Sequence, residues 1–280
     1  MKRKTTLLLS LLGAAVAAGI GGYLHLIKFE IRREVLVLHD ASRNRDVPVE
    51  LAISRRAELK KMFGFKPQVA IVNHGNTVPH SQYSFLGDVL ATQGYLVASI
   101  QHDMPGDPPL SMKGYPYLGR VPSYEKAEKN IIFAIGEIKK RYPKPDFSRV
   151  TMLGHSQGGD ITVFFANNHP EIVSRVVTLD NIRVPLLMSA KAKVLSFRSG
   201  NFKPDSGVVP PDDVCEDEGI QVVNTEFQHD HFTDHGPDAV KSKVREVLAR
   251  FLTDDKPKQH KPPRFKPVDD KWTVNYSPAQ

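Results

Sequence analysis

Short, mainly apolar runs recur along the body of the chain and are separated by segments in which apolar residues return at helical spacing. Short apolar runs without polar alternation are typical of strands that are covered on both faces. The runs lie at residues 69–72, 95–100, 150–153, 175–179, 193–197 and 220–224. Their alternation with helices predicts an α/β domain with a mostly parallel central sheet and helices on both faces.

The expected helices are marked by apolar residues that share one face. This spacing occurs over residues 83–90, 131–141 and 240–251. Ahead of the first parallel strand, residues 35–38 and 47–53 flank a polar turn, which predicts an N-terminal antiparallel hairpin.

With 280 residues, of which 40% are hydrophobic, the chain can build one sizeable core. The expected main domain spans residues 29–253. Within it, residues 101–122 are rich in proline and glycine and show no period, which predicts a long loop. Residues 254–280 shift towards Lys, Pro and Asp and predict a tail outside the packed core.

Residues 1–28 have the pattern of an export signal. Lys2, Arg3 and Lys4 precede an uncharged run over residues 5–27. That run is either cleaved after the small-x-small site at residues 15–17 or retained as a membrane anchor, because it is about as long as a span. Both readings place the body on the periplasmic or extracytoplasmic side of the membrane.

The formal net charge of +7 and the pI near 9.3 raise the question of an anionic partner. The basic residues are scattered and rarely interleaved with aromatic residues, so a nucleic-acid groove is not expected. Affinity for anionic membrane surfaces is the expected consequence. Cys215 is the single cysteine, which excludes an intramolecular disulfide.

The strongest chemical signal lies where the apolar run at 150–153 meets Gly154-His155-Ser156-Gln157-Gly158. A serine on a tight strand-to-helix turn needs small neighbours on both sides, and both neighbours at two residues' distance are glycines. Such a turn exposes Ser156 Oγ. The first free N–H groups of the following helix, including that of Gln157, point towards a developing oxyanion.

A serine hydroxyl needs a base within hydrogen-bond reach, and the base needs an acid that fixes its tautomer. Past the last predicted strand, histidines cluster at residues 229–235. Two acids lie between: Asp180 ends the run at 175–179, and Asp205 follows the next run in a longer loop. Asp180 is preferred because it ends an apolar strand directly, and Asp205 is the alternative acid.

The chain resembles α/β-hydrolases of the platelet-activating-factor acetylhydrolase and dienelactone hydrolase-like kind over roughly residues 34–252. The matching motifs are His74-Gly75-Asn76, Gly154-His155-Ser156-Gln157-Gly158-Gly159, Leu179-Asp180-Asn181 with Pro185, and His229-x-x-Phe232-x-Asp234. The resemblance implies the α/β-hydrolase fold and serine ester hydrolysis without a cofactor or metal.

It also implies the roles of the site residues. Ser156 would be the nucleophile, His229 the base and Asp180 the acid, with the backbone N–H groups of Asn76 and Gln157 forming the oxyanion hole. The substrate would be a small-molecule ester, either short-acyl or lipid-like, beneath the loop predicted at 101–122. His74, His102 and His155 are interpreted as structural histidines, and Asp160 as an acid favoured by the start of its helix.

Two alternatives from other classes remain open. The cluster of His229, His231, Asp234 and His235 is similar to the metal-binding motif of metallo-β-lactamase-type hydrolases, although its spacing is one residue too long. The chain could also be a catalytically inactive, membrane-tethered binding module that keeps the fold.

Overall fold

The computed structural model describes residues 2–111, 116–186 and 192–254, and within the first helix it describes the side chains of residue 10 and of residues 12 onwards. These residues form an eight-stranded sheet in the order β1-β2-β4-β3-β5-β6-β7-β8. The strands are β1 (Ile31–Asp40), β2 (Arg45–Ser54), β3 (Gln68–Asn73), β4 (Leu96–Ile100), β5 (Asp146–His155), β6 (Val173–Leu179), β7 (Lys193–Arg198) and β8 (Ile220–Asn224).

The sheet is mostly parallel. β1 pairs with β2 and β2 with β4 in antiparallel fashion, and every pairing from β4 through β3, β5, β6 and β7 to β8 is parallel. The predicted N-terminal hairpin and the six predicted parallel strands are confirmed. Because parallel strands end at a common edge, the segments that follow β3, β5 and β6 meet at one side of the sheet.

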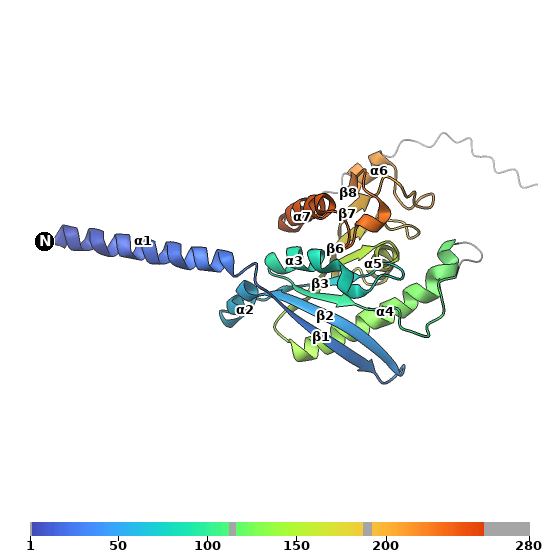
Figure 1. The fold of residues 1–280 in the computed structure, drawn as a ribbon, viewed down its shortest axis with the longest axis horizontal. Coiled ribbons are helices and arrows are strands. Elements are labelled where there is room, and N and C mark those ends of the chain that lie inside the picture. The colour runs from blue at the N-terminus through green and yellow to red at the C-terminus, as the bar shows by residue number, and fades with distance from the viewer. Residues whose placement is uncertain (1, 112–115, 187–191, 255–280) are drawn as a thin grey trace, which may run out of the picture.

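Helices cover both faces of this sheet, as predicted (Figure 1). α3 (Ser84–Thr92) and α7 (Asp238–Thr253) pack on one face, and α4 (Pro116–Arg141) and α5 (Gln157–Asn168) pack on the other. The shorter elements are α2 (Arg55–Met62), α6 (Asp212–Asp217), η1 (His80–Tyr83) and η2 (His229–His231).

The sheet separates two hydrophobic cores, one on each face, because successive side chains of a strand point to opposite faces. On β5, Met152 packs into the α4–α5 core, and its neighbour Leu153 packs into the α3–α7 core. Both side chains are fully buried. Removing each of them from water contributes about 2 kcal/mol, which is why such strands have no polar face in the sequence.

The prediction of a loop over residues 101–122 is partly wrong, because the last part of this segment is helical. Residues 112–115 lie outside the described part of the chain, and α4 begins at Pro116 and contains Pro122. A proline fits the first helical turn, but one at the seventh position removes a backbone hydrogen bond. Burial of Tyr124 and Ala127 against the sheet one turn later outweighs that local cost.

α1 (Lys2–Leu26) projects away from the body of the protein (Figure 1). In the run predicted as signal or anchor, the side chains of residues 5–9 and 11 lie outside the described set. Over the residues that were searched, no helix is long and apolar enough to cross a membrane. Export of the body therefore stays a prediction. The tail predicted at residues 254–280 lies outside the described residues from residue 255 onwards.

Candidate active site

Ser156 occupies a strained turn between β5 and α5. Its backbone angles are φ 54° and ψ −120°, a region that residues with a side chain rarely adopt. A Cβ on Gly154 would lie 2.0 Å from the carbonyl oxygen of Gly158, and a Cβ on Gly158 would lie 2.1 Å from that of Asn73. Both contacts are impossible, so the predicted glycines are required by the turn that holds Ser156.

His229 and Asp180 meet at the same edge of the sheet. His229 lies in η2, and Asp180 directly follows β6. Nδ1 of His229 lies 2.6 Å from Oδ2 of Asp180. A carboxylate can only accept, so Nδ1 carries the proton and Nε2 of His229 is left as an acceptor.

Asp180 is fully buried and is held from several sides. Ser199 donates its hydroxyl to Oδ2 at 2.5 Å and its N–H to Oδ1 at 3.1 Å, and the Arg198 guanidinium lies 3.0 Å from Oδ1. Burial by itself raises the pKa of Asp180, but the hydrogen bonds from His229 and Ser199 and the charge of Arg198 outweigh it and lower the pKa. The carboxylate therefore stays ionised and keeps His229 in one tautomer.

Ser156 is not hydrogen-bonded to His229 among the described residues. The His229 ring instead packs between the rings of His155 and Phe202, at centroid distances of 4.8 and 4.7 Å. Since His155 precedes Ser156 in the chain, this packing brings the base beside the elbow. Catalytic hydrogen bonds commonly tighten only when substrate is bound.

The two residues predicted for the oxyanion hole follow neighbouring parallel strands, since Gln157 comes after β5 and Asn76 after β3. Gln157 is the first residue of α5, so its backbone N–H has no partner within the helix. Its side chain is occupied, because Nε2 donates to Oγ of Ser123 at 2.9 Å. Asn76 lies in the exposed turn that follows β3, next to Gly75, which is buried.

Asp205, the alternative acid, does not contact His229. Its carboxylate pairs with the Arg183 guanidinium at 2.8 Å and is 40% exposed. A carboxylate in that position orients Arg183 and leaves the imidazole to Asp180. The geometry thus favours the acid that ends an apolar strand.

Asp234, one residue of the alternative metal cluster, supports the fold, and so does Phe232 within the same segment. Asp234 accepts the N–H groups of Ser84 and Phe85 at 2.8 and 3.0 Å, which caps α3. Phe232 is fully buried between the rings of His155 and Phe197. Within the part of the chain that the structure describes, no group of three or more His, Cys, Asp or Glu side chains could hold a metal ion.

A family model described as serine aminopeptidase, S33, matches residues 66–249, which include the elbow, Asp180 and His229. The chain belongs to the serine aminopeptidase S33 family. This is a hydrolase family of the α/β-hydrolase type, so the predicted fold family is confirmed. No curated protein sequence is detectably similar to the chain.

Several solved structures are similar in fold to this S33 family member. An S-formylglutathione hydrolase from Agrobacterium tumefaciens has a TM-score of 0.56 at 12% identity, covering 80% of this chain and 95% of that one. A ferulic acid esterase from Streptomyces cinnamoneus has 0.55 at 18%, covering 83% and 91%. A Klebsiella pneumoniae protein assigned as a dienelactone hydrolase has 0.54 at 16%, covering 80% and 99%. At these identities the likeness shows the fold alone.

One feature of this S33 family member could not be seen in its sequence. It is a chain of hydrogen bonds through Tyr83 and His155, called the relay below, that joins the turn after β3 to the loop that carries His229. Gly75 N–H donates to Oη of Tyr83 at 2.9 Å, so the Tyr83 hydroxyl proton faces Nδ1 of His155 at 3.0 Å. Nε2 of His155 must then carry the ring proton, which it donates to the carbonyl oxygen of His229 at 3.0 Å. The interpretation of His155 as a structural histidine holds, and its partner is the backbone of the candidate base.

His74 and His102 form a second buried network beneath the same turn. His102 N–H donates to Nε2 of His74 at 2.8 Å, so Nδ1 of His74 carries the proton that faces the carbonyl oxygen of Gly75 at 2.8 Å. Nε2 of His102 lies 2.9 Å from Oδ1 of Asn73, whose amide donates to Thr162 Oγ1. His74 has to be neutral in this pattern, because its Nε2 accepts a hydrogen bond. His102 is kept neutral by burial, which lowers its pKa.

Asp160 fixes the segment that follows Asp180. Its Oδ1 accepts the N–H groups of Ile182, Arg183 and Val184 at 2.8 to 3.0 Å. Burial raises the pKa of Asp160 to about 6, although those three hydrogen bonds act in the opposite direction. Asp160 is therefore more than a helix-start acid, because it ties α5 to the loop that holds the candidate acid.

We expect the protein to lose stability as the pH falls below about 6.5. Burial lowers the pKa of His155 to about 3 and also lowers the pKa of His74 and His102. Unfolded imidazoles have a pKa near 6.5, so below that pH the unfolded chain binds protons that the folded chain does not. Each histidine then removes about 1.4 kcal/mol of stability per pH unit until its folded pKa is reached.

Asp160 provides the control for this prediction. Between its ordinary pKa of 3.8 and about pH 6, the folded state binds a proton that the unfolded state lacks, so Asp160 partly offsets the histidines. Urea unfolding at pH 7, 6 and 5 should show the decline, and it should be steeper in Asp160→Asn, whose amide oxygen still accepts the three N–H groups. A free energy of unfolding that is flat from pH 7 to 5 would contradict the assignment of three neutral histidines.

Proposed function

We propose that this protein is a serine hydrolase that cleaves carboxylic esters through Ser156, His229 and Asp180. The observation that carries the proposal is the 2.6 Å contact between His229 and the buried Asp180, beside a serine held in a strained strand-to-helix turn. An imidazole fixed by a carboxylate and held beside a partly exposed serine is the arrangement from which serine hydrolases activate the hydroxyl.

In this mechanism Oγ of Ser156 attacks the acyl carbonyl while Nε2 of His229 accepts the hydroxyl proton. The carbonyl oxygen becomes an oxyanion, which the backbone N–H groups of Asn76 and Gln157 stabilise. His229 then gives its proton to the leaving alcohol as the ester bond breaks. Water, deprotonated by the same imidazole, releases the acid from the acyl-enzyme and restores Ser156.

The family name raises peptides as a second substrate class. Serine aminopeptidases cleave amides by the same acyl-enzyme chemistry, whereas the named structural neighbours include esterases. We favour a small-molecule ester, with a short-acyl or lipid-like acyl group, because an alkoxide leaves more easily than an amide nitrogen. An aminoacyl p-nitroanilide assayed beside an ester decides between the two.

A series of p-nitrophenyl esters of increasing acyl length tests the proposal. We expect turnover that a fluorophosphonate abolishes and that EDTA leaves unchanged. Loss of activity with EDTA would instead support the metal alternative, and an absence of turnover and labelling would support an inactive binding module. Faster cleavage of the p-nitroanilide would replace the ester by a peptide substrate.

Tyr83→Phe should lower kcat about tenfold while leaving KM for a small ester almost unchanged. The substitution deletes one hydroxyl and leaves the Gly75 N–H and Nδ1 of His155 unpaired in a buried site, which costs about 2 kcal/mol or more of stability. The His229 loop then loses the relay that fixes its backbone. Tyr142→Phe is the matched control, since that hydroxyl bonds Glu34 on the far side of the sheet. An unchanged kcat in Tyr83→Phe would show that the relay only supports the fold.

A further inference from the structure

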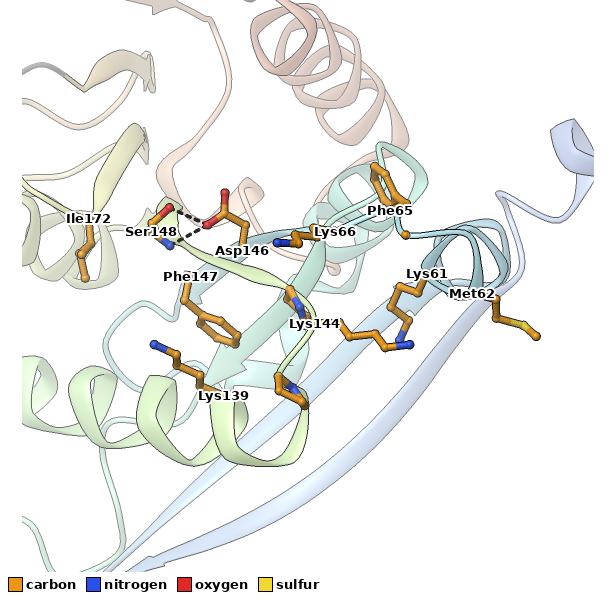
Figure 2. Close-up of a pocket in the computed structure, with 13 residues that line it drawn as sticks. Lys61, Met62, Phe65, Lys66, Lys139, Lys144, Asp146, Phe147, Ser148 and Ile172 are labelled. Carbon is orange, nitrogen blue, oxygen red and sulfur yellow. Dashed lines mark hydrogen bonds between the residues drawn. The ribbon is translucent and has the colours of Figure 1, made fainter.

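A basic hollow lies at the opposite end of the strands from Ser156. It has a volume of about 950 Å³ and is lined by the end of α2, the segment that leads into β3, the end of α4 and the start of β5. Four lysines surround it: Lys61, Lys66, Lys139 and Lys144 (Figure 2). We call this region, with its rim, the lysine face.

In the described part of the chain, the lysine face keeps an excess of positive charge, although the hydrogen bonds from Ser148 and the charges of Arg149 and Lys66 lower the pKa of Asp146 in its lining. None of the four lysines forms an ion pair with an acidic group in the described part of the chain. Among the described residues that line the hollow, Asp146 alone is acidic, and its Oδ1 already accepts the N–H and hydroxyl of Ser148 at 2.9 and 2.6 Å. Unpaired charges in a concave surface focus a positive potential, which favours an anionic partner.

The rim of the lysine face is apolar. Met62 ends α2 and is 75% exposed, Phe63 follows it and is 88% exposed, and Phe65 is 38% exposed. Exposed large apolar side chains beside basic residues can enter a lipid interface while the basic groups contact the headgroups. A soluble anion would use the lysines and leave Met62 and Phe63 in water.

This surface is continuous with the apolar N-terminal helix. Arg55 and Arg56, at the start of α2, donate their N–H groups to the carbonyl oxygens of Glu30 and Ile27, just beyond α1. The lysine face and α1 therefore lie at the same end of the molecule (Figure 1). Among the described side chains of α1, the exposed large apolar ones recur every three or four positions, at Leu12, Val16, Ile20, Tyr23 and Leu26.

We propose that the lysine face docks on a membrane surface that contains anionic lipids. Met62 and Phe63 insert among the headgroups, and the four lysines lie over the lipid phosphates. This contact is separate from the hydrolytic site and does not require α1 to cross the bilayer. It turns the end of the protein that carries α1 towards the lipid.

Vesicle flotation of the full chain tests the proposal. We expect binding to vesicles of phosphatidylcholine with phosphatidylglycerol and much weaker binding to phosphatidylcholine alone. Each lysine near an anionic surface contributes about 1 kcal/mol, so Lys61→Gln/Lys144→Gln should weaken binding roughly twentyfold or more. Lys129→Gln/Lys243→Gln removes the same charge from exposed lysines elsewhere on the body and should change binding several-fold less.

A second pair of variants tests the contribution of the apolar rim. Phe63→Ser should weaken binding about tenfold or more, since one phenyl side chain leaves the interface. Val37→Ser, at another exposed apolar site, on β1, should leave it unchanged. All four variants should hydrolyse a soluble ester at the parental rate, which reports an intact fold and is independent of lipid.

Three results would overturn the proposal. One is equal binding to neutral and anionic vesicles, and another is equal binding by the two lysine pairs. The third is binding of inorganic phosphate or of a single-stranded oligonucleotide that blocks vesicle binding and is lost in Lys61→Gln/Lys144→Gln but retained in Phe63→Ser. That pattern would assign the hollow to a soluble anion or a nucleic acid.

Discussion

Ser156→Ala should abolish turnover of a p-nitrophenyl ester and labelling by a fluorophosphonate while the protein stays folded. The loss should be on the order of 10⁴- to 10⁶-fold, because no other group on the elbow can form the acyl-enzyme. The residual rate would come from the oxyanion donors and substrate binding alone. Steady-state kinetics together with thermal unfolding measure both parts of the expectation.

Ser156→Gly is the matched control for the fold. The backbone at φ 54° and ψ −120° is strained for any residue with a Cβ, and glycine relieves most of that strain. We expect the glycine variant to be as inactive as Ser156→Ala and about 1 kcal/mol more stable than it. Activity comparable to the parent in either variant would refute Ser156 as the nucleophile.

The second large effect is expected at Asp180. Asp180→Asn should lower kcat by about 10³- to 10⁴-fold and barely change KM for a small ester. An amide that keeps its N–H₂ towards Nδ1 forces the proton onto Nε2 of His229, where it blocks acceptance of the serine proton. Ser199 and Arg198 already surround the other oxygen, so the amide has little freedom to turn.

Asp205→Asn is the comparison for that result. Its carboxylate pairs with Arg183 and is partly exposed, so this variant should keep kcat within a few-fold of the parent. If Asp205→Asn is the crippling change and Asp180→Asn is nearly silent, the acid has been misassigned. The ester-hydrolase proposal would then stand with another acid.

Most of the fold could be predicted because it depends on local pattern. Runs such as residues 69–72 are apolar on both faces, since each alternate side chain enters a different core. The start of α4 could not be predicted in this way, because Gly119 and Pro122 contradict a helix locally. Packing of Tyr124 and Ala127 against the sheet, which no short window of sequence contains, decides that segment.

In the candidate site, too, the parts that depend on neighbouring residues could be predicted and the parts that depend on distant residues could not. The elbow is local, since Gly154, Ser156 and Gly158 lie within five positions, and the sequence therefore predicts it. The relay joins Tyr83 to His155 across 72 positions and His155 to His229 across 74, so only the folded chain reveals it. The choice between Asp180 and Asp205 likewise depended on which carboxylate the parallel strands bring to the imidazole.

The length of β5 separates the two ends of the molecule. The strand begins at Asp146, in the lining of the lysine face, and ends at His155, next to Ser156. Ten residues of strand place these ends about 30 Å apart, which is comparable to the thickness of a bilayer's hydrocarbon core. A body resting on its lysine face would hold the nucleophile well above the headgroups, where it would receive dissolved esters diffusing past the surface in preference to acyl chains embedded in the bilayer.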